Sequence, residues 1–410
     1  MHLLSSQNRA EFLACPQLIR FEYANGRDNF EPSLLIKGNT LILKYIVLGA
    51  PMQLAFAMCE DRLLYALRVC DDGDAGGILW SIVERAEELN GIRGMARGEP
   101  LTAFLFNELS VNVAWANLST DGSFGFLSTW TDCASVGQVD HAKMKSIVEP
   151  LIDRLHGSGR DSEEWLVFEI DRESNWNAVH NHFITAGATS SLIDLFDSDE
   201  GNQQEQLGVW LTDSLQPLGI HHSPQIPKGN GTRELTDILF SHELGAALIE
   251  SKTISILARE RLPDRAKLKR DVSAHIDKAF AQLRGAIRAL RSGIPVTSPK
   301  GDTLTVERVK PAHAIVLIPD LGLVVDHAAY GIEFMRDFIG ATGAFAHLLD
   351  ISELLRVVQA AEIIAKRGST ITPMMAFDYY LTERAEKALG AGTLCIEVLL
   401  RLVEDEAGPE

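Results

Sequence analysis

Short apolar runs and stretches with helical spacing alternate along this chain, and the pattern predicts a mixed α+β fold. Runs rich in Leu, Ile and Val between Gly, Pro and Asn residues are typical of strands. We assign strands to residues 32–37, 40–48, 63–69, 111–118, 124–129, 165–170, 312–318, 321–325 and 345–349. Apolar residues three or four apart predict helices at residues 76–90, 141–155, 203–218, 271–291, 351–366 and 373–402.

Two further apolar runs flank the polar stretch 241–245 and predict a β-hairpin. The first run carries Asp237 late in its strand, and the second carries Glu250 and Lys252. Side chains alternate between the two faces of a strand, so Glu250 and Lys252 point the same way. Asp237 is expected to face them across the strand pair. The sequence therefore predicts two carboxylates and one ammonium at a single place on a sheet.

This trio suits a divalent cation and the hydrolysis of a phosphodiester. Two carboxylates close together repel each other, and a divalent cation relieves that repulsion. Oxygen ligands favour Mg²⁺ or Mn²⁺, and Mg²⁺ keeps several of its waters. A water on the metal is the expected nucleophile, which Lys252 would orient, or Lys252 would neutralise charge on the phosphorane.

The alternative is an ion pair of Glu250 and Lys252 on an exposed sheet face, where it contributes little to stability. The two charges interrupt an apolar run that resumes at Ile254. Charges within a buried strand are costly unless they are paired or used. This placement favours a functional site.

The spacing of Asp237 and the Glu250-x-Lys252 pattern resembles the PD-(D/E)XK nuclease superfamily, the fold of many restriction and repair endonucleases. The resemblance covers about residues 200–350, and Gln282 matches the Gln-bearing helix of several branches. It implies a restriction-endonuclease-like αβββαβ core with catalytic roles for Asp237, Glu250, Lys252 and Gln282. The implied activity is that of a Mg²⁺-dependent (or Mn²⁺-dependent) endonuclease acting on nucleic acid, DNA in particular, in restriction or phage defence.

The helix before the hairpin is expected to supply a third metal ligand beside Asp237 and Glu250. In the family this helix often carries a Glu, and the matching position here is Gly208. The nearest acid is Glu205, one turn earlier and off the apolar side of the helix. We therefore take Glu205 as the candidate ligand, with an exposed helix Glu of no function as the other interpretation.

The acidic linker at residues 197–202 predicts a domain boundary. We expect an N-terminal α+β domain of unknown role at residues 1–195, a nuclease-like domain at 200–355 and a helical C-terminal extension at 356–410. In the N-terminal domain the sequence shows no catalytic constellation.

The formal net charge of −18 is unusual for a protein that binds nucleic acid. Residues 252–291, however, carry 11 Lys or Arg against 4 Asp or Glu, a local charge of +7 that can hold a phosphate backbone or form a solvated helix surface. The acidic charge and the missing Glu at position 208 favour a second hypothesis. In it, the chain is an inactive relative of the nucleases that binds or scaffolds a larger complex.

The expected partners are nucleic acid and, in addition, a protein partner or a second copy of the chain. Five scattered Cys without a Cys-x-x-Cys spacing argue against a disulfide framework or a zinc site. The N-terminus shows no signal-peptide pattern, and the longest apolar stretch is too short for a bilayer. We therefore expect a cytoplasmic protein without a membrane partner.

Overall fold

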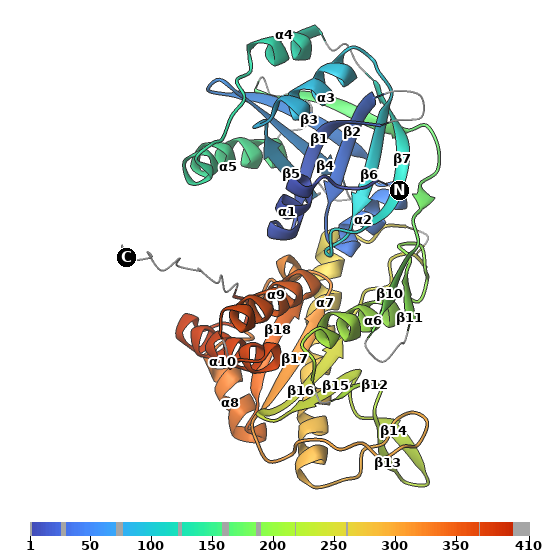
Figure 1. Ribbon diagram of the computed structural model, residues 1–410, viewed down its shortest axis with the longest axis vertical. Helices are drawn as coiled ribbons and strands as arrows, with labels where there is room; N and C mark the ends of the chain where they lie inside the picture. Colours follow the sequence, from blue (N-terminus) through green and yellow to red (C-terminus); the bar gives the residue numbers. More distant parts are fainter. Residues whose placement is uncertain are drawn as a thin grey trace. The chain divides into compact units, whose positions relative to one another are not determined.

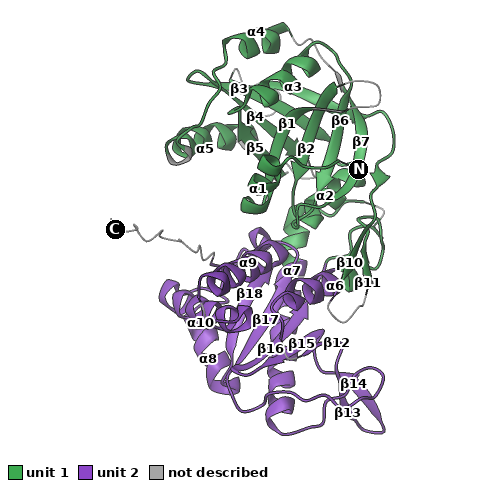
Figure 2. Ribbon diagram, in the orientation of Figure 1, with its two compact units in different colours: residues 1–184, 190–203, 254–270 green, residues 185–189, 204–253, 271–410 purple. Residues whose placement is uncertain are grey.

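The computed structural model describes residues 2–25, 30–70, 77–121, 125–157, 164–185, 190–217, 219–259, 261–368 and 370–396. The chain forms two compact units (Figure 2). Unit 1 comprises residues 1–184, 190–203 and 254–270, and unit 2 comprises residues 185–189, 204–253 and 271–410. The sequence pattern placed boundaries near residues 195–200 and 355. In the structure, segment 254–270 returns to unit 1, and the chain after residue 355 belongs to unit 2.

Unit 1 is built on a nine-stranded sheet with the order β1-β2-β6-β7-β8-β3-β4-β5, and β9 pairs with β7 (Figure 1). Neighbouring strands are antiparallel except for β2 and β6, which are parallel. The strands span Leu18–Asn25 (β1), Phe30–Lys37 (β2), Met52–Cys59 (β3), Arg62–Val69 (β4), Gly77–Ile82 (β5), Leu101–Phe106 (β6), Asn112–Asp121 (β7), Leu166–Arg172 (β8) and Asn177–Ala178 (β9).

The helices of unit 1 in the described residues are Ser6–Ala14 (α1), Thr40–Val47 (α2), Ala86–Ala96 (α3), Gly125–Cys133 (α4) and His141–Gly157 (α5), and a small hairpin joins Asn181–Ile184 (β10) to Ser190–Ile193 (β11). Helix α5 buries Met144, Val148 and Ile152 against apolar side chains of β3 and β4. These positions are three or four residues apart, as the amphipathic pattern of residues 141–155 predicted.

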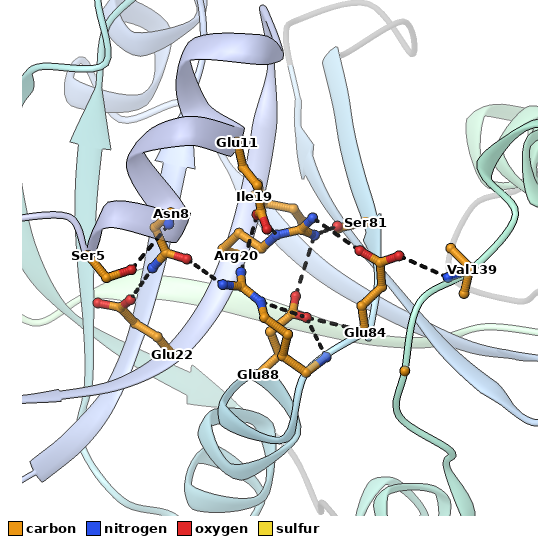
Figure 3. A network of polar contacts seen from close by, with 12 residues as sticks. Ser5, Asn8, Glu11, Ile19, Arg20, Glu22, Ser81, Glu84, Glu88 and Val139 are labelled. Carbon is orange, nitrogen blue, oxygen red and sulfur yellow. Dashed lines mark hydrogen bonds and ion pairs between the residues drawn. The ribbon is translucent and has the colours of Figure 1, made fainter. Parts of the chain in front are cut away.

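A buried polar network joins the first and last strands of this sheet, which share no backbone ladder (Figure 3). Arg20 of β1 donates to Ser81 Oγ of β5 and to Glu11 of α1, and it lies 3.4 Å from Glu88 of α3. Glu88 is fully buried and accepts a hydrogen bond from Tyr65. Side chains therefore connect β1 to β5 where main-chain pairing does not.

Unit 2 contains a five-stranded sheet with the order β12-β15-β16-β17-β18. The first three strands are antiparallel neighbours, whereas β17 is parallel to both β16 and β18. Their bounds are Gly219–His222 (β12), Ile238–His242 (β15), Gly245–Ser251 (β16), Ala312–Ile318 (β17) and Phe345–Asp350 (β18). Strands β15, β16 and β17 are buried throughout, as expected for central strands of a sheet covered on both faces.

A separate hairpin, Gln225–Lys228 (β13) and Gly231–Glu234 (β14), is inserted between β12 and β15. The helices are Glu200–Asp213 (α6), Arg265–Arg291 (α7), Ile332–Thr342 (α8), Ile351–Arg367 (α9) and Pro373–Ala391 (α10), with a 3-10 turn at Leu321–Leu323. Helices α6 and α7 each begin among residues of unit 1 and continue in unit 2. No helix in the described ranges is long and apolar enough to cross a membrane.

The mixed α+β class is confirmed, but two expected elements within the first 90 residues have the wrong type. Of the expected strand 40–48, residues 40–47 form helix α2 instead, and the Asn39 side chain caps the first turn by accepting a hydrogen bond from Ile42 N. Residues 76–90 were expected to be helical, but β5 occupies Gly77–Ile82 and α3 begins only at Ala86, where Glu88 accepts from Arg85 N. Residue 76 lies outside the described part.

Three other expectations are corrected. Helix α4 begins at Gly125, where a strand at 124–129 was expected; residue 124 is not described. The expected strand at 321–325 is a 3-10 turn, since Asp320 accepts from Gly322 N. Helix α6 starts at Glu200, inside the expected linker, and ends at Asp213; residue 218 lies outside the described residues.

The tail helix expected at 373–402 ends at Ala391, where Gly392 takes a left-handed φ of 73°, and residues 397–402 are not described. The expected hairpin around residues 241–245 is present, but its first strand begins at Ile238. Asp237 therefore precedes the strand instead of lying late in it.

Candidate active site

The three residues predicted from the hairpin meet at one end of the β15–β16 pair. Asp237 directly precedes β15, Glu250 lies in β16, and Lys252 follows its last residue. Lys252 Nζ is 2.7 Å from Glu250 Oε2 and 3.6 Å from Asp237 Oδ2. A single ammonium thus contacts both carboxylates, as the alternation of side chains along the strand predicted.

Backbone hydrogen bonds hold the trio in place. Ser251 N donates to Asp237 Oδ2 at 2.6 Å, so this carboxylate is fixed by the strand that carries Glu250. Lys252 N donates to Leu317 O of β17, which extends the parallel pairing past the end of β16. Gln204 of α6 donates to Ser251 Oγ and to the same Leu317 carbonyl. The site is therefore built on adjacent central strands and one helix.

Burial and mutual repulsion disfavour the ionised carboxylates. Asp237 is 8% exposed and Glu250 is 1% exposed. Burial, and then the charge of Glu250, raise the pKa of Asp237 to about 7. Burial also raises the pKa of Glu250, although Lys252 opposes this. Burial alone would lower the pKa of Lys252, but Glu250 and Asp237 reverse the effect and raise it. One cation therefore compensates two buried acids only in part.

The donor set fits Mg²⁺ or Mn²⁺ held by two carboxylates. Among the residues that the structure describes, no group of three or more His, Cys, Asp or Glu side chains is arranged for a metal ion. Mg²⁺ commonly binds through one or two carboxylates and keeps waters at its other positions. Burial and the neighbouring Glu250 raise the pKa of Asp237, and a bound cation would oppose both effects.

Glu205 lies near this pair but has its own partner. Its Oε2 is 2.8 Å from His222 Nε2 of β12, and Gln206 contacts the other ring nitrogen at 3.3 Å. The hydrogen bond that Glu205 accepts from the His222 ring raises the pKa of His222. The charge of Glu205 also contributes to the raised pKa of Asp237, so the two acids interact. The sequence reasoning missed His222; the His221-His222 pair directly after α6 was the available signal.

Position 208 of α6 is closely packed. A Cβ atom on Gly208 would lie 2.9 Å from Ile238 Cδ1, because α6 packs closely on β15 here. A larger side chain at this position would therefore require the end of the Ile238 side chain to shift. Glu205 is the acid of this helix nearest to position 208 in sequence.

Gln282 is exposed on α7, and within the described ranges no hydrogen bond joins it to Asp237, Glu250 or Lys252. The structure therefore gathers Asp237, Glu250 and Lys252, brings Glu205 into electrostatic reach of Asp237, and leaves Gln282 without a contact to the trio. Its catalytic role stays a prediction from the resemblance.

The chain was compared with protein-family models, with curated proteins and with solved structures, and none of the three comparisons finds a match. Functional inference therefore depends on the geometry and electrostatics of the site.

Proposed function

We propose that this protein is a metal-dependent nuclease that hydrolyses phosphodiester bonds. The observation that carries the proposal is the buried Asp237–Glu250 pair, which shares one ammonium and is short of positive charge. Strongly perturbed acids with a specific charge partner are typical of catalytic and ligand sites. Their structural cost is unexplained unless a cation or a substrate completes the site.

The order of elements around the site supports the same proposal. Elements α6, β12, β15, β16, α7 and β17 follow one another as helix, three strands, helix and strand, with β13 and β14 as an insertion. This is the αβββαβ order that a PD-(D/E)XK nuclease core implies. Asp237 and the Glu250-x-Lys252 pattern fall on the second and third of these strands and their ends, as the resemblance implies. We include in this proposal a role for the nuclease in restriction or phage defence.

In this mechanism Asp237 and Glu250 would hold the cation, which would supply positive charge for the hydrolysis of a phosphodiester. Lys252 orients the attacking water and offsets negative charge that develops on the phosphorane. Ser251 N keeps the Asp237 carboxylate turned toward Glu250. Preorganised groups of this kind act without reorganising at the moment of reaction.

The test is cleavage of DNA in Mg²⁺ or Mn²⁺ by wild type, Lys252→Ala and Lys366→Ala. Lys366 is an exposed Lys in the last turn of α9 and serves as the matched control. We expect Lys252→Ala to lose about 10²- to 10³-fold in rate with an unchanged circular dichroism spectrum, and the control to cleave normally. Equal cleavage by wild type and Lys252→Ala would reject the site.

A second candidate function is an inactive binding or scaffolding subunit that engages a protein partner. The net charge of −18 and the absence of a Glu at position 208 favour it. Calorimetric titration with Mg²⁺ and Mn²⁺, with and without Glu250→Gln, separates the two functions. Metal binding that depends on Glu250 supports the nuclease, and no binding by wild type supports the scaffold.

A further inference from the structure

The β13–β14 hairpin projects from unit 2 next to the candidate active site. It is inserted between β12 and β15, and both of its ends are tied to the residues around Asp237. Ser223 N donates to Asp237 O at 2.8 Å, and Leu235 N donates to Pro224 O at 2.8 Å. The ribbon in Figure 1 shows this hairpin standing clear of the five-stranded sheet. A molecule bound along the hairpin would therefore reach the site.

The base of the hairpin is anchored. Ile226 and Val296 are buried, and Gln225 and Thr297 exchange two backbone hydrogen bonds of 2.8 and 2.9 Å. The two-residue turn begins with Gly229, whose φ of 58° suits the first central position of a tight hairpin turn. The hairpin is thus a defined ribbon on a fixed base.

Beyond this base the ribbon is exposed on both faces. Every residue from 227 to 234 is exposed. A two-stranded hairpin without packing on either face is marginally stable in water. An exposed ribbon next to a charged site is therefore a candidate surface for a partner.

Its charge indicates the chemistry of that partner. Ile226 pairs with Arg233 and Lys228 with Gly231, so the side chains of Lys228 and Arg233 belong to the same face of the ribbon. In the described part of the chain neither cation forms an ion pair with a carboxylate; Arg233 Nη1 donates only to the neighbouring Glu234 O. Two uncompensated cations on one face of an acidic protein suit phosphate groups.

We propose that the β13–β14 hairpin enters the major groove of duplex DNA, with Lys228 and Arg233 on phosphates. The inference rests on the proposed nuclease function. The major groove of B-form DNA admits a two-stranded ribbon, whereas the deep, narrow major groove of double-stranded RNA does not. Single strands are bound by aromatic stacking, and residues 225–234 contain no aromatic side chain. Duplex DNA is therefore the partner that the ribbon fits.

Fluorescence anisotropy of a labelled DNA duplex tests this proposal, with EDTA present so that cleavage does not interfere. The test variant is Lys228→Gln/Arg233→Gln. The control is Lys366→Gln/Arg367→Gln, which removes the same charge from two exposed side chains at the end of α9. We expect the test variant to bind about tenfold more weakly or worse at 0.1 M salt, and the slope of affinity against salt to fall by about 2. The control should bind as wild type does.

Unchanged binding by the hairpin variant overturns the inference, as does equal or tighter wild-type binding to single-stranded DNA or duplex RNA. The same proteins are assayed for cleavage in Mg²⁺. Wild-type cleavage with an unaffected hairpin variant rejects the hairpin and leaves the nuclease standing. Hairpin-dependent binding without any cleavage rejects the nuclease and leaves the hairpin as a DNA-binding element.

Discussion

Two buried charged clusters in this chain differ in how many cations and hydrogen-bond donors reach their carboxylates. In unit 1, Arg20 lies within 4 Å of three carboxylates, and Arg85 contacts two of the same three, Glu11 and Glu88 (Figure 3). Glu88 also accepts hydrogen bonds from the Tyr65 hydroxyl and from the backbone N–H groups of Glu84 and Arg85. In unit 2, the one cation that Asp237 and Glu250 share among the described residues is Lys252.

We propose that this difference distinguishes a structural cluster from a site that binds a ligand. Burial alone would lower the pKa of Arg20, but its acidic neighbours, Tyr65 and Glu88 first, raise it. The network therefore stabilises the positive charge of Arg20. In unit 2 burial and repulsion raise the pKa of Asp237 to about 7, so the cluster disfavours its own ionised form. A fold keeps such a group when a ligand completes the charge balance.

The largest expected effect is on unit 1. Arg20→Ala leaves the buried Glu88 with less compensation, and we expect a loss of about 3–5 kcal/mol in unfolding free energy. Five of the six tryptophans belong to unit 1, so urea unfolding followed by tryptophan fluorescence monitors it. A loss below about 1 kcal/mol, the size seen for surface pairs, would show that the network is not a balanced structural cluster.

In unit 2, by contrast, removing a buried charge should cost little stability. Asp237→Asn removes a disfavoured charge but keeps an oxygen for Ser251 N, so we expect little loss of stability at pH 7. It should abolish the stabilisation by Mg²⁺, which for wild type is about 2.7 kcal/mol at a hundredfold excess over Kd. Thermal unfolding with and without Mg²⁺ measures both. Equal Mg²⁺ stabilisation in wild type and variant would contradict the assignment of Asp237.

The pH dependence of stability sharpens the comparison further. The pKa of Asp237 is raised from 3.8 to about 7 on folding, so between these values the folded state holds a proton that the unfolded state has released. Unit 2 should therefore lose stability as pH rises from about 4 to 7, by about 1.4 kcal/mol per pKa unit at most, and level off above. Asp237→Asn should reduce this slope. Denaturation midpoints measured across the pH range test this prediction. A wild-type midpoint that does not change between pH 4 and 7 would contradict the raised pKa of Asp237.

A smaller effect concerns Glu205 and His222. The hydrogen bond that Glu205 accepts from the His222 ring raises the pKa of His222, so Glu205→Gln should lower this pKa. Because the charge of Glu205 also acts on Asp237, the same variant should move the pKa of Asp237 downward. NMR titration of the His222 ring is the readout. An unchanged His222 titration would show that the pair does not form in solution.

The smallest expected effect is a gain in the stability of unit 2 from a substitution in α7. Gly285 lies inside α7, and a Cβ atom added there meets nothing within 4 Å. Gly285→Ala should therefore stabilise the helix by about 0.5–1 kcal/mol, since Gly loses more backbone freedom than Ala on folding. Chemical denaturation of unit 2 tests this. Destabilisation would mean that α7 is packed more closely here.

Local patterns in the sequence determined the strands and helices with clear periodicity and the meeting of Glu250 with Lys252. These features depend on spacing along one element, which the chain carries in itself. A continuous apolar run such as 40–48 did not distinguish strand from helix, because the Asn39 cap and the surrounding contacts decided it.

Tertiary structure alone decided the electrostatic state of the site and its surroundings. How strongly Asp237 resists ionisation depends on burial and on how many cations reach it, which no spacing encodes. The pairing of Glu205 with His222, the closed position at Gly208 and the exposed β13–β14 ribbon depend on which elements pack together. Sequence fixes which charges are available, but only the packed fold sets how far apart they lie and how much water is left between them.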